Sequence, residues 1–295
     1  MKKTLRLSNN ETYAYLETNP HHSEVMILIH GNMSSSIHYQ PIWDALAQDH
    51  RVLAMDLRGF GDSTYHTPIE SLKDLAQDVA LFMEALDVEQ AHVVGWSTGG
   101  GIALELALLE PKKVRSLVLL ESASVLGYPI YRKDAQFQPI LTELYQSKED
   151  MAQDPVQVVP AVQAMQNNDI AFMKAVWEAA IYNVQKPSEK HLNVFLSESL
   201  KQCNLVDIDW ALMTFNLTDQ SNGVVAGNGT VNDLKTPILN VWGRQDFVIP
   251  EIMFQQNQQY LKTAQHLIYD DGSHSPLTDF PERLAHDILQ FINKH

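Results

Sequence analysis

Cysteine is almost absent from this chain of 295 residues, which contains only Cys203. One cysteine cannot form a disulfide within the chain, and no cysteine pair is present to hold a structural zinc ion. The lack of disulfides fits a reducing compartment, and we therefore expect a cytoplasmic protein. The residues around Cys203 predict an ordinary, partly buried thiol.

Long hydrophobic runs are also missing, since no stretch approaches the roughly 18 apolar residues of a membrane-spanning helix. The chain begins Met1-Lys2-Lys3, but no apolar block follows, so we expect no secretory signal peptide. Positive charge is scarce, because 21 Lys and Arg residues stand against 36 Asp and Glu residues, a net charge of −15. This surplus of negative charge argues against nucleic acids and membranes as partners.

The sequence offers no convincing metal or cofactor site. His21 and His22 are adjacent, but no His-x-x-x-His pair with an acid is present. Residues 56–63 carry two glycines, yet they lack the Gly-Lys-Ser/Thr ending of a nucleotide loop and the spacing of a dinucleotide site. We expect no metal and no cofactor, and we expect residues 56–63 to form a rigid structural turn held by an Asp56–Arg58 network.

What the chain does have is an alternation of strand-like and helix-like segments. Leu5 and Leu7, then Tyr13 and Tyr15, alternate with polar residues and predict an opening β-hairpin. Further expected strands are residues 25–29, 51–56, 91–94, 114–120, 237–242 and 265–269, and expected helices are 42–47, 72–86, 101–109 and 284–292. This order predicts an α/β protein with a mostly parallel sheet flanked by helices on both sides.

The alternation stops near Ser122 and resumes at Pro237. The residues between are rich in Gln and Asn, with helix-like apolar spacing, no strong strand pattern and a loop over 216–231. One helix is expected around residues 161–180 and another around 192–200. We therefore predict a helical insertion of about 110 residues, at the scale of a small domain. The expected division is a core of residues 1–123 and 234–295 and an inserted helical unit of residues 124–233.

The most specific motif is Gly95-Trp96-Ser97-Thr98-Gly99, which reads Gly-x-Ser-x-Gly. It lies between an expected buried strand and an expected Ala/Leu-rich helix. A tight strand-to-helix turn presents a serine at its tip, and glycines flank it because side chains would collide there. This context predicts Ser97 as a nucleophile, which needs a base to remove its proton.

His274 is the expected base, because it lies in a loop between the last expected strand and the last helix. The carboxyl ends of parallel strands meet at one edge of a sheet, where the Ser97 turn also lies. Asp246 directly follows another strand and is the favoured acid to orient His274, which gives the chain order Ser, Asp, His. The alternative acids are Glu121 at the end of a core strand and Asp270 or Asp271 beside the histidine.

A carbonyl oxygen that gains negative charge needs fixed N–H donors. We expect the backbone N–H groups of Thr98 and Asn32 to provide them, with Met33 as the alternative second donor. His30 is expected to be a structural residue under this loop. Trp96 and Met33 are candidates for substrate contact, and packing beneath the turn is the alternative role for Trp96.

Taken together, the motifs resemble the α/β-hydrolase superfamily, in its capped serine esterase and lipase-like branch. The matching pieces are His30-Gly31-Asn32, residues 56–63, residues 95–100, Gly243-Arg244-Gln245-Asp246 and Gly272-Ser273-His274. The resemblance implies an α/β-hydrolase fold, a helical cap at residues 124–233 and hydrolysis through an acyl-enzyme on Ser97. The His-Gly-Asn start with Gly-Trp-Ser is also similar to some acyl-homoserine lactone hydrolases. Thr98 is a departure, since many relatives carry Met or Leu there.

These observations predict a cofactor-free enzyme that cleaves a small-molecule ester, with a lactone as the alternative substrate. Carbon–carbon bond hydrolysis and peracid formation on the same triad are further alternatives, and cap shape decides among them. Serine at position 97 argues against the branches with an aspartate nucleophile, the dehalogenases and epoxide hydrolases. A non-catalytic binding protein on the same fold is the remaining alternative. The sequence does not predict an oligomeric state.

Overall fold

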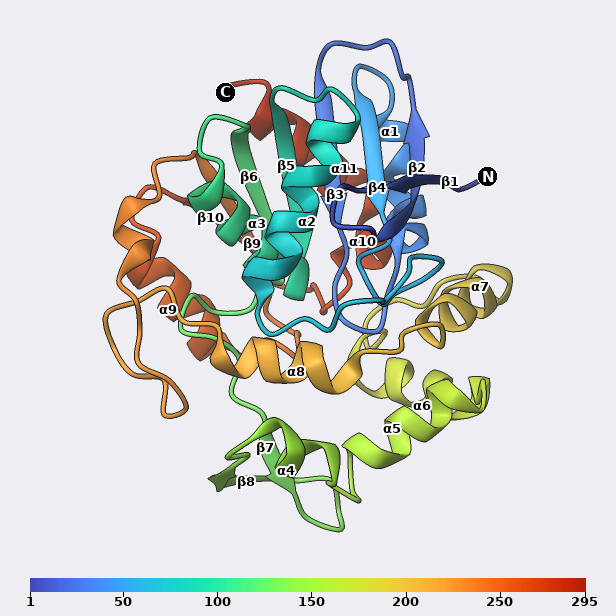
Figure 1. Ribbon diagram of the computed structural model, residues 1–295, viewed down its shortest axis with the longest axis vertical. Coiled ribbons are helices and arrows are strands. Elements are labelled where there is room, and N and C mark those ends of the chain that lie inside the picture. Colours follow the sequence, from blue (N-terminus) through green and yellow to red (C-terminus); the bar gives the residue numbers. More distant parts are fainter.

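An eight-stranded sheet forms the centre of the protein in the computed structural model, which describes residues 1–295 (Figure 1). The strands lie in the order β1-β2-β4-β3-β5-β6-β9-β10. Their bounds are β1 Lys3–Arg6, β2 Thr12–Thr18, β3 Val25–Ile29, β4 Arg51–Met55, β5 Ala91–Trp96, β6 Val114–Leu120, β9 Ile238–Gly243 and β10 Gln265–Tyr269. Strands β1 and β2 form the predicted hairpin, β2 is antiparallel to β4, and the other pairings are parallel. The expectation of a mostly parallel α/β sheet is therefore confirmed.

Helices cover both faces of the sheet because the inner strands are apolar on both faces. In β3, Ile27 and Ile29 pack into one apolar cluster, whereas Met26 and Leu28 pack into a second on the opposite face. Adjacent residues of a strand point to opposite faces. The first cluster includes α2 (Leu72–Ala85) and α3 (Thr98–Leu109), and the second includes α1 (Gln40–Leu46) and α11 (Pro281–Ile292). Figure 1 shows α2 and α3 in front of the sheet and α11 behind it.

Three further elements complete this part of the chain, namely η1 (Ser36–Tyr39), α9 (Glu251–Tyr260) and α10 (Pro276–Asp279). Helix α9 was not predicted, because its sequence is mostly polar and offers no long apolar stripe. It is held instead by Met253 and Phe254, which pack against Trp242 of β9. None of the helices is both long and apolar enough to cross a membrane.

The segment between β6 and β9, two neighbours in the sheet, differs from the expectation in two ways. It contains an antiparallel hairpin, β7 (Tyr131–Lys133) and β8 (Pro139–Leu144), although no strand was expected. Strand β8 is largely exposed and β7 is half-buried, so their sequences carry no apolar alternation. The segment between β6 and β9 also contains the helices α4 Lys148–Ala152, α5 Val158–Gln166, α6 Ile170–Ala180, α7 Glu189–Ser199 and α8 Leu205–Thr214, followed by η2 Thr230–Asp233.

The single helix expected over residues 161–180 is wrong, because α5 and α6 are separate helices. Asn168 between them has a left-handed backbone (φ +54°), which an α-helix cannot contain. Asp169 then starts α6, because its carboxylate accepts a hydrogen bond from the Phe172 N–H at 2.9 Å. A polar Asn-Asn-Asp run therefore ends one helix and caps the next.

The inserted segment lies against the carboxyl ends of the parallel strands. Helix α8 crosses below the sheet, and the hairpin with α4, α5 and α6 forms a lower lobe (Figure 1). Ile208 and Leu212 of α8 join the same apolar cluster as α2 and α3. Trp177 of α6 and Phe195 of α7 join the cluster on the opposite face. The division at residues 124 and 233 stays a prediction.

Candidate active site

Ser97 lies at the junction of β5 and α3, on the predicted sharp turn. Its backbone has φ +55° and ψ −118°, a conformation that a non-glycine residue adopts only under strain. A side chain at Gly95 would collide with the Gly99 carbonyl, and one at Gly99 would collide with the Ile29 carbonyl. The turn is tied to the sheet by the Ser97 N–H, which donates to the Leu120 carbonyl at 2.8 Å. The Gly-x-Ser-x-Gly pattern thus follows from steric demands of this turn.

His274 and Asp246 lie in contact, although 28 residues separate them in the chain. The His274 Nδ1 donates to Asp246 Oδ2 at 2.7 Å, and both side chains are buried. Asp246 Oδ1 accepts hydrogen bonds from the N–H groups of Val248 at 2.6 Å and Ile249 at 2.8 Å, which fixes the carboxylate. Because Nδ1 carries its proton toward Asp246, Nε2 of neutral His274 is free to accept a proton.

Trp96 connects the Ser97 turn to the His274 loop. Its indole N–H donates to the His274 carbonyl at 2.8 Å, and the two rings lie 5.8 Å apart between centroids. The hydrogen bonds of the His274 ring include Asp246 but not Ser97 Oγ. Trp96 is only 2% exposed and its N–H is occupied. This placement favours packing beneath the turn over substrate contact.

The other acids considered from the sequence have different partners. Asp270 pairs with Arg244 at 3.0 Å, and Asp271 faces Arg283 at 3.7 Å on the surface. Glu121 is fully buried after β6, and its Oε2 accepts a hydrogen bond from the Gly243 N–H at 3.0 Å. Of the four candidate acids, Asp246 is therefore the one that bonds to His274.

Glu121 lies close enough to Asp246 for the two carboxyl groups to influence each other. Burial, and then the charge of Asp246, raises the pKa of Glu121 well above its ordinary value. Its Oε1 is buried without a hydrogen-bond donor in the protein. A protonated Glu121 satisfies this arrangement, because it leaves one negative charge on the pair rather than two.

The two expected N–H donors flank Ser97. Gly31 lies so close that an added Cβ would stand 2.9 Å from Ser97 Cβ, so the loop after β3 closely approaches the nucleophile turn. Neither the Asn32 N–H nor the Thr98 N–H donates a hydrogen bond within the protein. The Met33 N–H is occupied, since it donates to Asn32 Oδ1 at 3.1 Å and to Gln202 Oε1 at 2.9 Å.

His30 has the structural role expected for it. Its Nε2 accepts a hydrogen bond from the Leu57 N–H at 3.0 Å, and its Nδ1 donates to the Gly31 carbonyl at 2.8 Å. Burial lowers the pKa of His30 to about 4, so the ring stays neutral. The ring therefore joins the loop after β3 to the segment that follows β4.

The turn at residues 56–63 requires a correction, because Asp56 and Arg58 do not share a network. Asp56 accepts hydrogen bonds from Lys2 Nζ at 2.7 Å and from two backbone N–H groups, those of Ser36 and Asp62. Arg58 instead pairs with Asp78 at 2.8 Å. The buried Asp56 organises backbone N–H groups around itself, so it needs no arginine.

The expectation that Cys203 is partly buried is wrong, because Cys203 is exposed. Its neighbours Gln202 and Asn204 are buried and hydrogen-bonded instead. Gln202 and Asp209 contact the loop after β3, and sequence reasoning missed both. No motif marks either residue.

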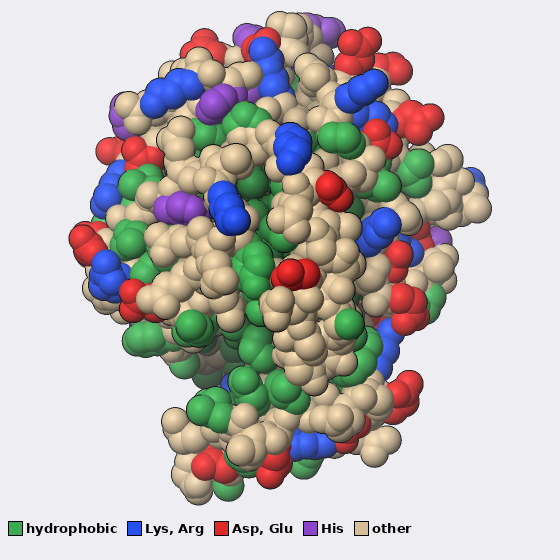
Figure 2. All heavy atoms as spheres, turned by 90° about the vertical axis from the view of Figure 1, so that its left-hand side faces the viewer, with side chains coloured by type: hydrophobic (Ala, Val, Ile, Leu, Met, Phe, Trp, Pro, Cys, Tyr) green, Lys and Arg blue, Asp and Glu red, His purple; other side chains and the backbone are tan.

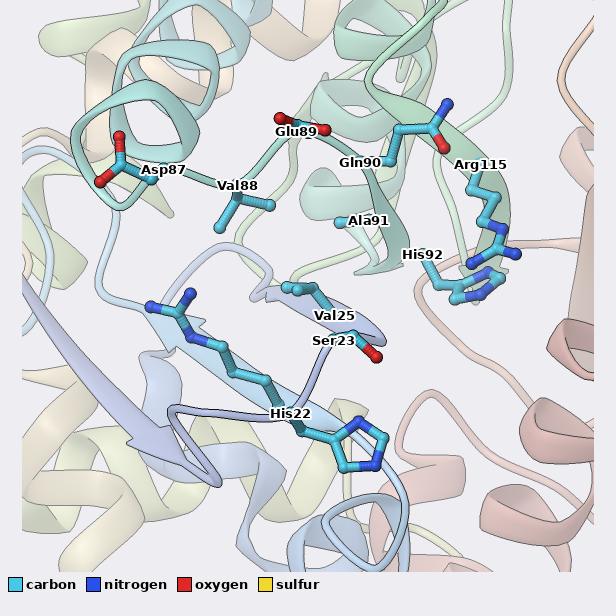
Figure 3. Close-up of a pocket in the computed structure, with 11 residues that line it drawn as sticks. His22, Ser23, Val25, Asp87, Val88, Glu89, Gln90, Ala91, His92 and Arg115 are labelled. Carbon is cyan, nitrogen blue, oxygen red and sulfur yellow. The ribbon is translucent and has the colours of Figure 1, made fainter.

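A cavity of about 410 Å³ lies at the opposite end of the strands from Ser97 (Figure 3). It is lined by the beginnings of β3, β4 and β5, including Val25, Arg51 and Ala91. Figure 3 shows His92 and Arg115 side by side on one wall. Its arginines are already paired, Arg51 with Glu17 and Arg115 with Glu24. This cavity is separate from the Ser97 turn.

Near the inserted segment, a smaller cavity of about 220 Å³ is lined mainly by apolar side chains and by Gln202. Figure 2 shows a hollow between the lower lobe and the body, with hydrophobic side chains around it. The lining of this smaller cavity is therefore more apolar than that of the 410 Å³ cavity.

The family described as the alpha/beta hydrolase fold matches residues 24–281 of the chain. Among curated proteins, the acetoin-cleaving dihydrolipoyllysine-residue acetyltransferase component of Pseudomonas putida is 26% identical over 286 residues. That alignment covers 92% of this chain, which spans 64% of the length of the relative. The 2-hydroxymuconate semialdehyde hydrolase of Pseudomonas sp. strain CF600 is 39% identical over 124 residues, 40% of this chain and 44% of that protein.

A relative of matching length is the pimeloyl-(acyl-carrier protein) methyl ester esterase of Aeromonas hydrophila. It is 26% identical over 276 residues, which cover 90% of this chain and 94% of that protein. Among solved structures, the enol-lactonase from Burkholderia xenovorans LB400 superposes with a TM-score of 0.76 at 16% identity. The superposition covers 99% of this chain and 100% of the enol-lactonase, and it demonstrates a shared fold.

Proposed function

Because the chain belongs to the alpha/beta hydrolase fold family, we propose that it is a serine hydrolase that cleaves carboxylic esters. In this proposal Ser97, His274 and Asp246 act as the catalytic triad. The observation that carries it is the buried 2.7 Å hydrogen bond between His274 and Asp246 beside the strained Ser97 turn. Relatives that include an esterase of matching length support the choice of an ester.

The first step is the attack of Ser97 on the ester. Its Oγ bonds to the carbonyl carbon while the hydroxyl proton moves to His274 Nε2. The π electrons of the carbonyl move onto its oxygen, which becomes negatively charged. The unoccupied N–H groups of Asn32 and Thr98 stabilise this oxygen, and Asp246 stabilises the charged imidazolium. Catalytic hydrogen bonds often tighten only when substrate is bound, so Ser97 and His274 align in that complex.

The second step releases the alcohol. The negative charge returns to form the carbonyl, the bond to the alkoxy oxygen breaks, and His274 gives its proton to that oxygen. The acyl group remains on Ser97 Oγ. Water then repeats the sequence, with His274 as base, and releases the carboxylic acid. No cofactor enters these steps.

We further propose that residues 124–233 act as a cap over this site. Their helix α8 and the segment before it contact the loop that contains Asn32 and Met33. The apolar surroundings of the hollow in Figure 2 suit an apolar part of an ester. A cap of this kind would exclude water while the acyl-enzyme forms.

Carbon–carbon bond hydrolysis on the same residues is the second candidate. It is favoured by the relative named 2-hydroxymuconate semialdehyde hydrolase, which shares 39% identity over 124 residues. The same nucleophile and base would serve a ketone carbonyl whose leaving group is a stabilised carbanion. Substrate chemistry therefore separates the two candidates.

The experiment combines a covalent probe with a substrate panel. We expect a fluorophosphonate to label Ser97, and we expect Ser97→Ala to abolish labelling and nearly all turnover while the thermal unfolding temperature stays close to wild type. The panel contains p-nitrophenyl esters of increasing chain length, lactones and a 2-hydroxy-6-oxo dienoic acid. Preference for the last would favour carbon–carbon hydrolysis. Absence of labelling and turnover would favour a binding protein, and full activity of Ser97→Ala would refute the triad.

A further inference from the structure

The side chain of Asn32, in the loop after β3, is held at both ends by the inserted segment. Its Oδ1 accepts a hydrogen bond from Gln202 Nε2 at 2.8 Å, and its Nδ2 donates to Asp209 Oδ1 at 2.8 Å. Both partners come from residues more than 160 positions away in the sequence. Both polar atoms of the Asn32 side chain thus make internal hydrogen bonds, whereas its backbone N–H makes none within the protein.

The next residue, Met33, shows why this loop needs support. Its backbone is left-handed (φ +51°), a conformation that costs a non-glycine residue on the order of 1 kcal/mol. The Met33 N–H donates to Gln202 Oε1 at 2.9 Å and to Asn32 Oδ1 at 3.1 Å. Gln202 therefore binds both residues. Its Nε2 donates to the Asn32 side chain, and its Oε1 accepts from the Met33 backbone N–H.

Gln202 is itself firmly held. It is buried, and its Nε2 also donates to Asn204 Oδ1 at 3.1 Å. Asn204 Nδ2 in turn donates to the Arg58 carbonyl at 2.9 Å, and the Cys203 N–H donates to the Gly59 carbonyl at 3.0 Å. Glycine is required at position 59, because an added side chain would collide with Asn204. The turn at residues 56–63 thus docks the segment that carries Gln202.

From these contacts we propose that Gln202 is a positioning residue for the oxyanion site. By fixing the Asn32 side chain and the Met33 N–H, it aims the Asn32 N–H at the oxygen that becomes negative in the reaction. This inference rests on the proposed ester hydrolysis at Ser97. Gln202 does not touch the reacting atoms, so it acts through Asn32. The inserted segment then completes the site rather than only covering it.

The simpler alternative is that Gln202 only fastens the inserted segment to the rest of the protein. Loss of such a fastener would lower the unfolding temperature and weaken substrate binding, which raises KM. A positioning role changes the stabilisation of the transition state, so it lowers kcat while KM stays nearly constant. The two roles therefore separate in the kinetic constants.

The test uses Gln202→Met, which keeps the length of the side chain and removes its hydrogen bonds. We expect kcat for the best ester to fall about 10- to 100-fold, because a donor displaced by about 1 Å can cost 100-fold in rate. We expect KM to stay within about threefold, and binding of an arylboronic acid, which mimics the tetrahedral intermediate, to weaken in parallel with kcat. Gln166→Met is the control for the same change of side chain, since Gln166 lines the same small cavity but its exposed side chain makes no hydrogen bond.

Asn32→Ala provides a second variant that keeps the backbone N–H but removes both side-chain contacts. We expect it to lower kcat as well, and the double variant to lose less than the product of the two single losses. An unchanged kcat in a folded Gln202→Met protein would overturn the inference. A variant with a raised KM and a lowered unfolding temperature but the kcat of wild type would do so as well. Failure of the proposed function is recognised separately, because Ser97→Ala would then keep its turnover or the wild-type protein would show neither labelling nor turnover, and the inference would fall with it.

Discussion

Asp246 and Glu121 are two carboxyl groups at neighbouring strand ends, and their hydrogen bonds give them different roles. Asp246 uses one oxygen for two backbone N–H groups and the other for His274. Glu121 uses one oxygen for the Gly243 N–H, and its other oxygen has no donor in the protein. A negative charge is therefore well supported on Asp246 and poorly supported on Glu121.

Asp246→Asn tests this assignment. The backbone N–H groups of Val248 and Ile249 will retain the amide oxygen, so the amide NH2 will face His274 Nδ1. Two donors then meet, and His274 must place its proton on Nε2, where it cannot act as base. We expect kcat/KM at pH 7.5 to fall by about 10³- to 10⁴-fold, measured with the preferred ester of the panel.

Glu121→Gln is the control for that substitution. Glutamine keeps an oxygen for the Gly243 N–H and an NH2 toward Asp246, so it copies protonated Glu121. We expect kcat/KM to change less than about tenfold, because the charge on Asp246 is unaltered. A large loss in Glu121→Gln together with retained activity in Asp246→Asn would make Glu121 the acid that orients His274.

Part of the candidate site could be predicted from the sequence, because residues that directly follow parallel strands are expected at the same edge of the sheet. His274 and Asp246 each follow a strand of a parallel sheet, and such ends converge at one edge. Gln202 could not be found in this way. Its contact with Asn32 spans 170 residues, and it depends on how an inserted segment docks on a turn. No spacing rule connects these two positions.

The turn between β5 and α3 works only while helix and strands can approach closely. At Gly99 an added Cβ would collide with the carbonyls of Ile29 and His30, which belong to backbone and cannot rotate away. At Gly101, two residues later in α3, an added Cβ would come too close only to the end of the Leu72 side chain, at 2.7 Å, and would meet the Phe215 ring at an ordinary contact distance of 3.5 Å. Two glycines in one helix therefore have different reasons to be glycine.

Gly99→Ala should consequently destabilise the protein, whereas Gly101→Ala should be nearly neutral. Overpacking against fixed atoms typically costs about 1–3 kcal/mol, and displacement of the helix would also disturb Ser97. At Gly101 the better helix propensity of alanine, about 1 kcal/mol, offsets a small shift of Leu72. Urea unfolding of both variants measures the difference. Equal stabilities would show that α3 can move away from β3 freely.

Most sheet strands and core helices could be predicted because their apolar periodicity reflects burial. Strand β3 is buried at all five positions and was expected with the same bounds. The hairpin β7–β8 could not be predicted, because its strands are not buried on one face and carry no apolar alternation. Helix α9 could not be predicted, because it is held by packing against Trp242 of β9. The break between α5 and α6 was visible as Asn167-Asn168-Asp169, but apolar spacing on both sides concealed it.

Across the whole molecule, Lys2 joins segments that are remote in the sequence. Its Nζ contacts Asp56 at 2.7 Å, Asp62 at 2.9 Å and Glu198 of α7 at 2.6 Å. Asp56 is fully buried, so loss of the lysine would leave its charge supported only by backbone N–H groups. The first residues of the chain thus help to hold the inserted segment.

We expect Lys2→Met to lower the free energy of unfolding by about 1–3 kcal/mol, because the buried Asp56 carboxylate loses a charged hydrogen-bond donor but keeps two backbone N–H donors. Lys3→Met is the control, since Lys3 is about half exposed and its partner Glu17 also pairs with Arg51. Its loss should stay below about 1 kcal/mol. Chemical denaturation of both variants at moderate salt measures the two losses in the free energy of unfolding. Equal losses would mean that the Lys2 cluster contributes no more than a surface pair.

Buried histidines make the stability of the whole protein depend on pH. Burial lowers the pKa of His38 to about 3 and that of His30 to about 4, so both stay neutral in the folded state. In the unfolded chain they take up protons below about pH 6.5. Acidification from pH 7 therefore favours the unfolded state through these groups. Asp209 acts in the opposite direction, because burial raises its pKa to about 7 and the folded state holds its proton more firmly.

His38→Asn isolates one histidine from this balance. Asparagine keeps an acceptor for the Ser35 N–H, which His38 Nδ1 binds at 3.1 Å, but it does not titrate. Loss of the ring from its stack with Trp177 and Phe195 will lower stability at every pH. The informative quantity is the change in the free energy of unfolding between pH 7 and pH 5, compared between wild type and the variant. One proton is worth about 1.4 kcal/mol per pH unit, so wild type should lose about 2 kcal/mol more than the variant over this range. Equal pH dependence in urea unfolding would mean that His38 takes up its proton over the same pH range in the folded protein as in the unfolded chain.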